Sequence, residues 1–125
     1  MKTLGIDFGT KRIGLAISDE LGMLARELVI WSPDEFWQQI TGLITAEQVE
    51  RIVVGLPLNM SGEETAKTEE VKAFAAKLKK QFTLPVVFAD ERLSSTMAEQ
   101  IAGTSKQIDS LAAQIILQNF LNSLK

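Results

Sequence analysis

Residues 3–18 read TLGIDFGTKRIGLAIS, two short apolar runs separated by a small turn. Apolar residues alternate with others up to Phe8, and this period of two predicts a strand. The second run, 13–18, follows so closely that the two runs are expected to pair as an antiparallel hairpin. A third apolar run, 23–31, is expected to extend the hairpin into a three-stranded meander.

The rest of the chain alternates between helical and strand patterns, and no linker or repeat divides it. The resulting order, β-β-β-α-β-α-β-α-α, predicts one α/β domain over residues 1–125. We expect a mixed five-stranded sheet, three strands antiparallel and two added in parallel by right-handed crossovers, with helices on both faces. The later strands are expected at 51–56 and 84–89, and the helices from a Ser32 cap through Ile44, over 63–80, in a short segment ending at Ile101, and over 108–124.

The composition limits the chemistry that the chain can perform. The sequence contains neither cysteine nor histidine, which excludes disulfides, thiolate metal sites and a Ser-His-Asp triad, and removes the usual zinc ligands. Its 13 basic and 16 acidic residues leave a net charge of −3, which argues against a strong non-specific nucleic-acid binder. A carboxylate site is itself negative without metal, so a nuclease stays possible. With no signal peptide or membrane span, we expect a cytoplasmic protein without a membrane partner.

Acidic residues occur at the ends of two predicted strands. Asp7 interrupts an apolar strand, where a carboxylate is costly unless it is paired, bound to metal or turned toward solvent. Asp90 and Glu91 follow the last predicted strand, where the alternative is an ordinary charged loop. Ligands of such sheets bind beyond the carboxyl ends of parallel strands. Both positions are therefore candidates for a functional site.

A third candidate is Asp109, which is expected to head the last helix. Its ordinary role there would be a favourable interaction with the positive helix terminus. However, Asp109 shares one helical face with Ala112, Ala113 and Ile116, and this small, apolar face could lie close to the sheet. An inward Asp109 beside two other carboxylates would need a cation, so metal binding is favoured over capping.

The turn between the first two strands is a candidate anion site. Gly9, Thr10 and Lys11, with Gly14 shortly after, form a turn of little bulk whose backbone N–H groups could approach a phosphate. The alternative is a plain hairpin turn, for which one glycine suffices. Lys11 and Arg12 carry positive charge at the same place and are candidates for phosphate contact, as is Arg92.

Taken together, four segments of the chain resemble one family, the YqgF family of RNase H-like proteins, described as Holliday junction resolvases and as pre-16S rRNA nucleases. They occur in family order, cover nearly the whole chain and so are far more specific than any single motif. The segments are GIDFGTKRIGLAISD at 5–19, VVGLPLNMSG at 53–62, LPVVFADERLSS at 84–95 and IDSLAAQIILQ at 108–118.

The resemblance implies an RNase H-like fold with Asp7, Glu91 and Asp109 as catalytic acids and ligands of Mg²⁺, which Mn²⁺ can replace. Glu91 is chosen over Asp90 by this resemblance, because a period of two does not separate neighbours. In two-metal hydrolysis the bound ions activate a water and stabilise the leaving oxygen, so no histidine is required. The expected phosphate-binding residues are Gly9, Thr10, Lys11, Arg12 and Arg92.

The function implied is a metal-dependent nuclease that processes the 5′ end of pre-16S rRNA, or alternatively a Holliday junction resolvase. The expected partner is structured RNA or branched DNA, and the chain is expected to act as a monomer or weak homodimer. The family often carries a longer, basic stretch before its last helix. Here residues 103–107 contain only Lys106 as a basic residue, which predicts modest affinity.

Two other classes of function compete with a nuclease. The segment DFGTKRIG at 7–14 also resembles the phosphate loop of the actin, Hsp70 and sugar-kinase superfamily, which closes two lobes around ATP. A chain of 125 residues supplies one lobe, which disfavours that function. A non-catalytic nucleic-acid-binding module would account for the weak basic character, and the intact acidic trio argues against it.

Overall fold

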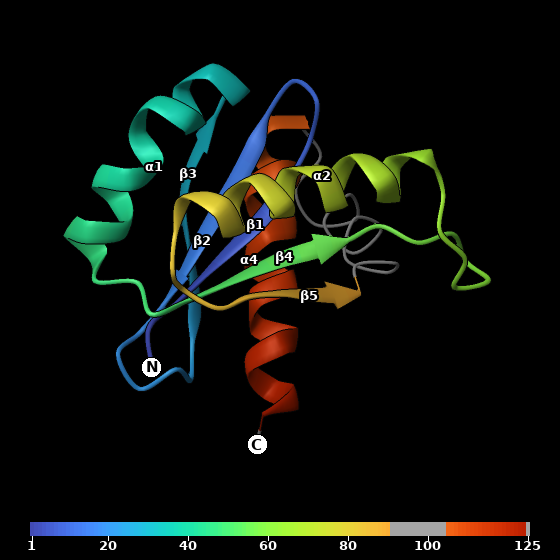
Figure 1. Ribbon diagram of the computed structural model, residues 1–125. Coiled ribbons are helices and arrows are strands. Elements are labelled where there is room, and N and C mark those ends of the chain that lie inside the picture. The colour runs from blue at the N-terminus through green and yellow to red at the C-terminus, as the bar shows by residue number, and fades with distance from the viewer. Residues whose placement is uncertain (91–104, 125) are drawn as a thin grey trace.

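A five-stranded mixed sheet in the order β3-β2-β1-β4-β5 forms the centre of the chain (Figure 1). The computed structural model describes residues 1–90 and 105–124, and of residues 105–110 it describes the backbone alone. β1, β2 and β3 are antiparallel, while β4 joins β1 and β5 joins β4 in parallel, as predicted. The strands are β1 (Thr3–Phe8), β2 (Ile13–Ser18), β3 (Ala25–Trp31), β4 (Arg51–Leu56) and β5 (Val86–Asp90).

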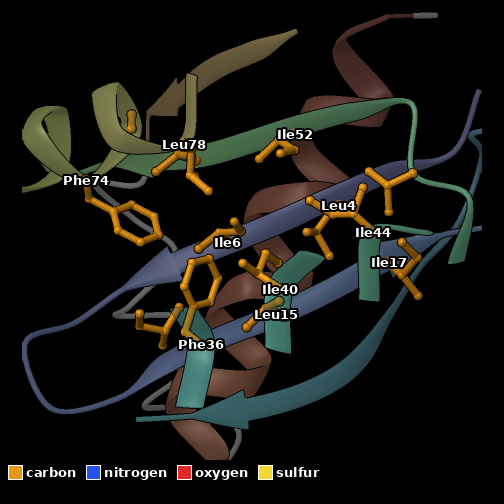
Figure 2. Close-up of a cluster of buried hydrophobic side chains, with 14 of the residues drawn as sticks. Leu4, Ile6, Leu15, Ile17, Phe36, Ile40, Ile44, Ile52, Phe74 and Leu78 are labelled. Atoms are coloured by element: carbon orange, nitrogen blue, oxygen red, sulfur yellow. The ribbon is translucent and has the colours of Figure 1, made fainter. Parts of the chain in front are cut away.

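One face of the sheet is covered by α1 (Pro33–Glu47) and α2 (Ala66–Gln81). Alternate residues of the strands point into this core, which Figure 2 shows. Burying them removes apolar surface from water, the main favourable term in folding. The core includes Leu4, Ile6, Leu15, Ile17 and Ile52 from the sheet, with Phe36, Ile40, Ile44, Phe74 and Leu78 from the two helices.

Local hydrogen bonds fix the start of α1, as the sequence predicts. The Ser32 hydroxyl accepts from the Glu35 N–H at 3.2 Å, and the Glu35 carboxylate accepts from the Ser32 N–H at 3.0 Å. This reciprocal pair is a capping box. Pro33 suits the first helical position, because a backbone N–H there would have no partner within the helix and proline has no N–H.

The opposite face of the sheet is covered by α4 (Ser105–Ser123), so helices lie on both faces as predicted (Figure 1). The helix approaches β1 at Gly5, where an added Cβ would lie 2.8 Å from the Leu117 Cβ and 3.3 Å from the Ala113 carbonyl oxygen. Glycine is therefore required here for close packing of helix on strand. Ala16 of β2 joins Ala113 and Leu117 in the same cluster.

Contacts along α4 show that it runs antiparallel to β1. Ala113 lies against Gly5 in the middle of β1. Phe120 lies beneath the guanidinium of Arg51, and Arg51 pairs with Thr3 at the start of β1. The N-terminal end of α4 is therefore beside the end of β1, at the same end of the molecule as the β1–β2 turn (Figure 1).

Side chains of α4 also hold the edge strand β3. The Gln118 Oε1 accepts from the Ala25 N–H at 2.9 Å, and the Gln114 Nε2 donates to the Ala25 carbonyl oxygen at 3.2 Å. The Gln118 Nε2 donates to the Met23 carbonyl oxygen at 3.0 Å. The last helix therefore spans the sheet from β1 to its edge.

Two elements begin later than predicted because side chains bind the backbone just before them. β3 begins at Ala25, not at residue 23, since the Asp19 carboxylate accepts from the Met23 N–H at 2.7 Å and holds a turn there. This hydrogen bond lowers the pKa of Asp19. α2 begins at Ala66, not at residue 63, since the Asn59 side chain accepts from the Glu63 N–H at 2.9 Å.

Two further boundaries differ. β5 covers Val86–Asp90 instead of 84–89, because its parallel pairing with β4 runs from Val86 to Asp90. The last helix begins at Ser105, so residues 105–107 are helical and do not belong to a loop. The short helix predicted to end at Ile101 lies outside the described residues.

Substituting two glycines tests the packing of α4. We expect Gly5→Ala to lower the free energy of unfolding by about 1–3 kcal/mol, because its Cβ would force α4 away from the sheet. Gly42→Ala, in α1 with no atom within 4 Å of the added Cβ, should raise it by about 0.5–1 kcal/mol. Urea unfolding measures both, and an equally stable Gly5→Ala protein would contradict the close contact.

Candidate active site

Asp7 is the penultimate residue of β1 and is half-buried. It follows Gly5 in the alternation of the strand, so it lies on the α4 face, while Ile6 points into the other core. The residue paired with it on β2 is Gly14, and on β4 the residue after the partner of Ile6 is Gly55. Because neither glycine has a side chain, the two neighbouring strands place no side chain directly beside Asp7 on this face.

At the second acidic position, the register of β5 shows which face of the sheet Asp90 lies on. Val86 and Phe88 of β5 pack against the core beneath α1 and α2. Asp90, which is exposed, continues that series by register and is therefore on the face opposite Asp7. Glu91 and Arg92, which the sequence predicts as catalytic acid and phosphate ligand, lie outside the described residues.

The third acid does not head its helix, contrary to the prediction. Asp109 is the fifth residue of α4, and the first turn of that helix contains no acidic residue. Asp109 therefore lies beyond the first turn, where the interaction of an acid with the helix terminus is strongest. The helix extends further toward its N-terminus than the apolar pattern indicated because Ser105, Lys106 and Gln107 continue it with polar residues.

The register of α4 on β1 brings the backbones of Asp7 and Asp109 to the same end of the sheet. Ala113 lies against Gly5, and Asp109 precedes Ala113 by four residues, about 6 Å along the helix axis. Asp7 follows Gly5 by two residues, about 6.6 Å along β1 in the same direction, because helix and strand are antiparallel. The backbones at these two positions thus lie across from one another, while the Asp109 side chain is outside the described part.

The described side chains alone do not complete a metal site. Among them, no group of three His, Cys, Asp or Glu residues lies close enough to hold an ion. Of the three predicted acids, only the side chain of Asp7 belongs to this set. Mg²⁺ prefers hard oxygen donors, and the half-buried carboxylate of Asp7 supplies them.

A groove lies beside this position, between the β1–β2 turn and α2. It has a volume of about 430 Å³ and is lined by Phe8, by residues 9–12, and by Lys67 and Glu70 of α2. The turn itself requires glycine, since an added Cβ at Gly9 would lie 2.6 Å from the Arg12 carbonyl oxygen. Four of the five predicted phosphate-binding residues therefore line one concave surface.

Sequence reasoning missed Lys67. In the sequence it resembles the other lysines of a charged helix. The one distinguishing signal is that it precedes Phe74 by two helical turns and so lies on the same face. Phe74 packs on Phe8, with ring centroids 4.5 Å apart, which brings that face of α2 to the end of β1.

None of the helices in the described part of the chain is long and apolar enough to cross a membrane.

Comparison of the sequence with known proteins points to one family. Residues 1–123 match the family model described as "RuvX: Holliday junction resolvase". A relative from Geobacillus thermodenitrificans is 42% identical over 136 residues, covering 98% of this chain and 99% of the relative. One from Halothermothrix orenii is 43% identical over 133 residues, covering 98% and 95%. Both carry the name "Putative pre-16S rRNA nuclease".

Solved structures confirm the fold. Thermus thermophilus RuvC in complex with a Holliday junction substrate aligns with a TM-score of 0.61 at 18% identity, covering 99% of this chain and 95% of that one. Fowlpox virus resolvase in complex with Holliday junction DNA aligns with a TM-score of 0.57 at 12% identity, covering 99% of both chains. With its RNase H-like fold and a family match over residues 1–123, this chain belongs to the RuvX family, the YqgF family that its sequence motifs resemble.

Proposed function

We propose that this chain is a metal-dependent nuclease that hydrolyses nucleic-acid phosphodiester bonds at Asp7, Glu91 and Asp109. The observation that carries the proposal is the placement of Asp7 on the α4 face, beside two glycines and across from the backbone of Asp109. Two acidic residues held near one another repel, and a divalent cation bound to both removes that repulsion.

The same register supports Glu91 over Asp90. Asp90 is on the face that α1 and α2 cover, away from Asp7. Glu91 is the next residue along the chain, and the family motif assigns it the catalytic role. We therefore propose Asp7, Glu91 and Asp109 as ligands of Mg²⁺, with Mn²⁺ as a substitute.

Each part of the proposed site has a chemical task. Bound divalent ions supply charge neutralisation of the phosphate and acidification of a water molecule. The three carboxylates hold and orient these ions, so substitution by an amide removes a ligand charge while preserving shape. The phosphates of the substrate are bound by Lys11, Arg12 and Arg92. The backbone of residues 9–10, which lines the same groove as Lys11 and Arg12, also contacts a phosphate.

The proposed substrate is the precursor of 16S rRNA, cut at its 5′ end. Relatives at about 40% identity, aligned over nearly their whole length, carry the name "Putative pre-16S rRNA nuclease". The weakly basic stretch of residues 103–107 favours it as well, because it offers a single cation to a large branched substrate. A Holliday junction is the second candidate, supported by the family description and by the fold shared with junction-bound resolvases. A junction would require two chains to supply two active sites.

A cleavage screen tests the nuclease directly. The substrates are labelled pre-16S rRNA 5′ leader, single-stranded RNA and a four-way DNA junction, each with Mg²⁺ or Mn²⁺. Loss of a residue that only supports a metal ligand lowers activity roughly 10- to 100-fold. We expect Asp7→Asn, Glu91→Gln and Asp109→Asn each to lower activity by more than this, because each removes a ligand itself. The same variants should bind nucleic acid as well as the parent or better, because each removes a negative charge.

Asp90→Asn is the matched control for this screen, since it removes an acid one residue from Glu91 but on the other face from Asp7. It should cleave at the parental rate. Parental rates in Asp7→Asn and Glu91→Gln would show that the activity lies elsewhere or comes from a contaminant.

Arg92→Ala tests the phosphate contact next to Glu91. We expect weaker binding of every nucleic acid and a salt dependence reduced by about one contact. Binding titrations between low and high salt measure the slope. An unchanged slope would remove Arg92 from the binding surface.

Melting curves test the metal site without relying on activity. Binding to the folded chain alone should raise its stability by about 2.7 kcal/mol at a metal concentration 100 times the dissociation constant. We expect the melting temperature to rise with Mg²⁺ or Mn²⁺ in the parent and in Asp90→Asn, and the rise to be blunted in Asp7→Asn. A flat curve for the parent across a wide Mn²⁺ range would count against the site.

A further inference from the structure

The end of β1 presents adjacent residues to opposite sides of the sheet. Asp7 is on the α4 face, whereas Phe8 points to the other face and lines the groove between the β1–β2 turn and α2. The two Cα atoms are separated by one peptide unit, about 3.8 Å. A ligand at Asp7 and a ligand in the groove are therefore neighbours across one strand end.

The groove is basic, although the chain as a whole has a net charge of −3. Lys11, Arg12 and Lys67 line it with one acid, Glu70. Within the described part of the chain, Lys11 and Lys67 form no ion pair, whereas Lys72 of the same helix is paired with Glu64. Two exposed ammonium groups are thus available to an anion from opposite walls, one on the turn and one on the helix.

One aromatic side chain, that of Phe8, lines the groove. Phe8 is half-buried and is supported from behind by Phe74, with the two rings tilted by 34°. Aromatic rings flanked by cations are the surface that single-stranded nucleic acid uses, with bases against rings and phosphates against Lys or Arg. A volume of about 430 Å³ lies within the range of small-molecule pockets, which is the scale of a nucleotide and not of a duplex.

We propose that this groove is a subsite for single-stranded RNA next to the bond that is cut. Lys11 and Lys67 bind a backbone phosphate there, a nucleotide lies against Phe8, and the strand crosses the edge of the sheet at the end of β1. The subsite rests on the proposed nuclease function and adds to it a requirement that the substrate strand extends past the active site. Lys67 is then a substrate-binding residue that lies outside the metal site.

Binding of a labelled single-stranded oligouridine to the metal-free protein tests the subsite apart from cleavage. We expect Lys67→Gln to weaken binding several-fold and to lower the salt slope by about one. Glu70→Gln should strengthen binding, because it removes the acid of the same groove. Both side chains are exposed, so neither change should disturb the fold.

Lys80→Gln is the matched control, since it removes the same charge from the same helix about 20 Å away. It should leave the affinity and the salt slope near the parental values. Equal effects of Lys67→Gln and Lys80→Gln would overturn the subsite. The subsite would also be overturned if Lys67→Gln abolished the binding of adenosine triphosphate but left the binding of oligouridine unchanged.

Cleavage kinetics separate this inference from the nuclease proposal. With an RNA that extends past the cut bond and one that ends near it, Lys67→Gln should lower the ratio of kcat/KM for the long over the short RNA several-fold. Parental cleavage with an unchanged ratio would overturn the subsite and leave the nuclease standing. A parent that cuts neither RNA nor the junction would overturn the nuclease, while the oligouridine titration still decides the subsite.

Discussion

The contact between α4 and Gly5 is the constraint on which the rest of the arrangement depends. A helix can lie this close to a strand only where the strand has no side chain, and at Gly5 even a methyl group would collide with Leu117. The contact fixes both the height and the direction of α4 over β1. It thereby determines which turn of the last helix lies nearest the end of β1, where we propose that Asp7 and Asp109 share a ligand.

Alternation along β1 distributes two kinds of chemistry to two faces. The α4 face receives Asp7 and the proposed metal site, which needs negative charge at a half-buried position. The other face receives Phe8 and the basic groove, which needs positive charge at the surface. The sheet lies between the basic groove and the proposed carboxylate site. A nucleic-acid strand, with a phosphate at every nucleotide, is a ligand that can contact both.

Much of the fold could be predicted from local sequence, and much of the site could not. The hairpin of residues 3–18 and the capping box at Ser32 depend on neighbouring residues, so their patterns are visible in the chain. The starts of β3 and α2 depend on the Asp19 and Asn59 side chains, which bind backbone several residues away, and periodicity does not detect this. Lys67 joins the turn residues only through tertiary packing, and the face of Asp90 requires the register of β5 on β4.

The hydrogen bonds from α4 to β3 have a consequence for how copies of this chain behave in a crowded solution. An edge strand ordinarily exposes N–H and C=O groups that can recruit a strand from another molecule and begin aggregation. At Ala25 both groups are already occupied, by the amides of Gln118 and Gln114. A foreign strand would have to displace two side-chain amides from a packed helix before it could extend the sheet there. The helix that shapes the proposed active site thus also blocks strand addition at the first residue of this edge strand.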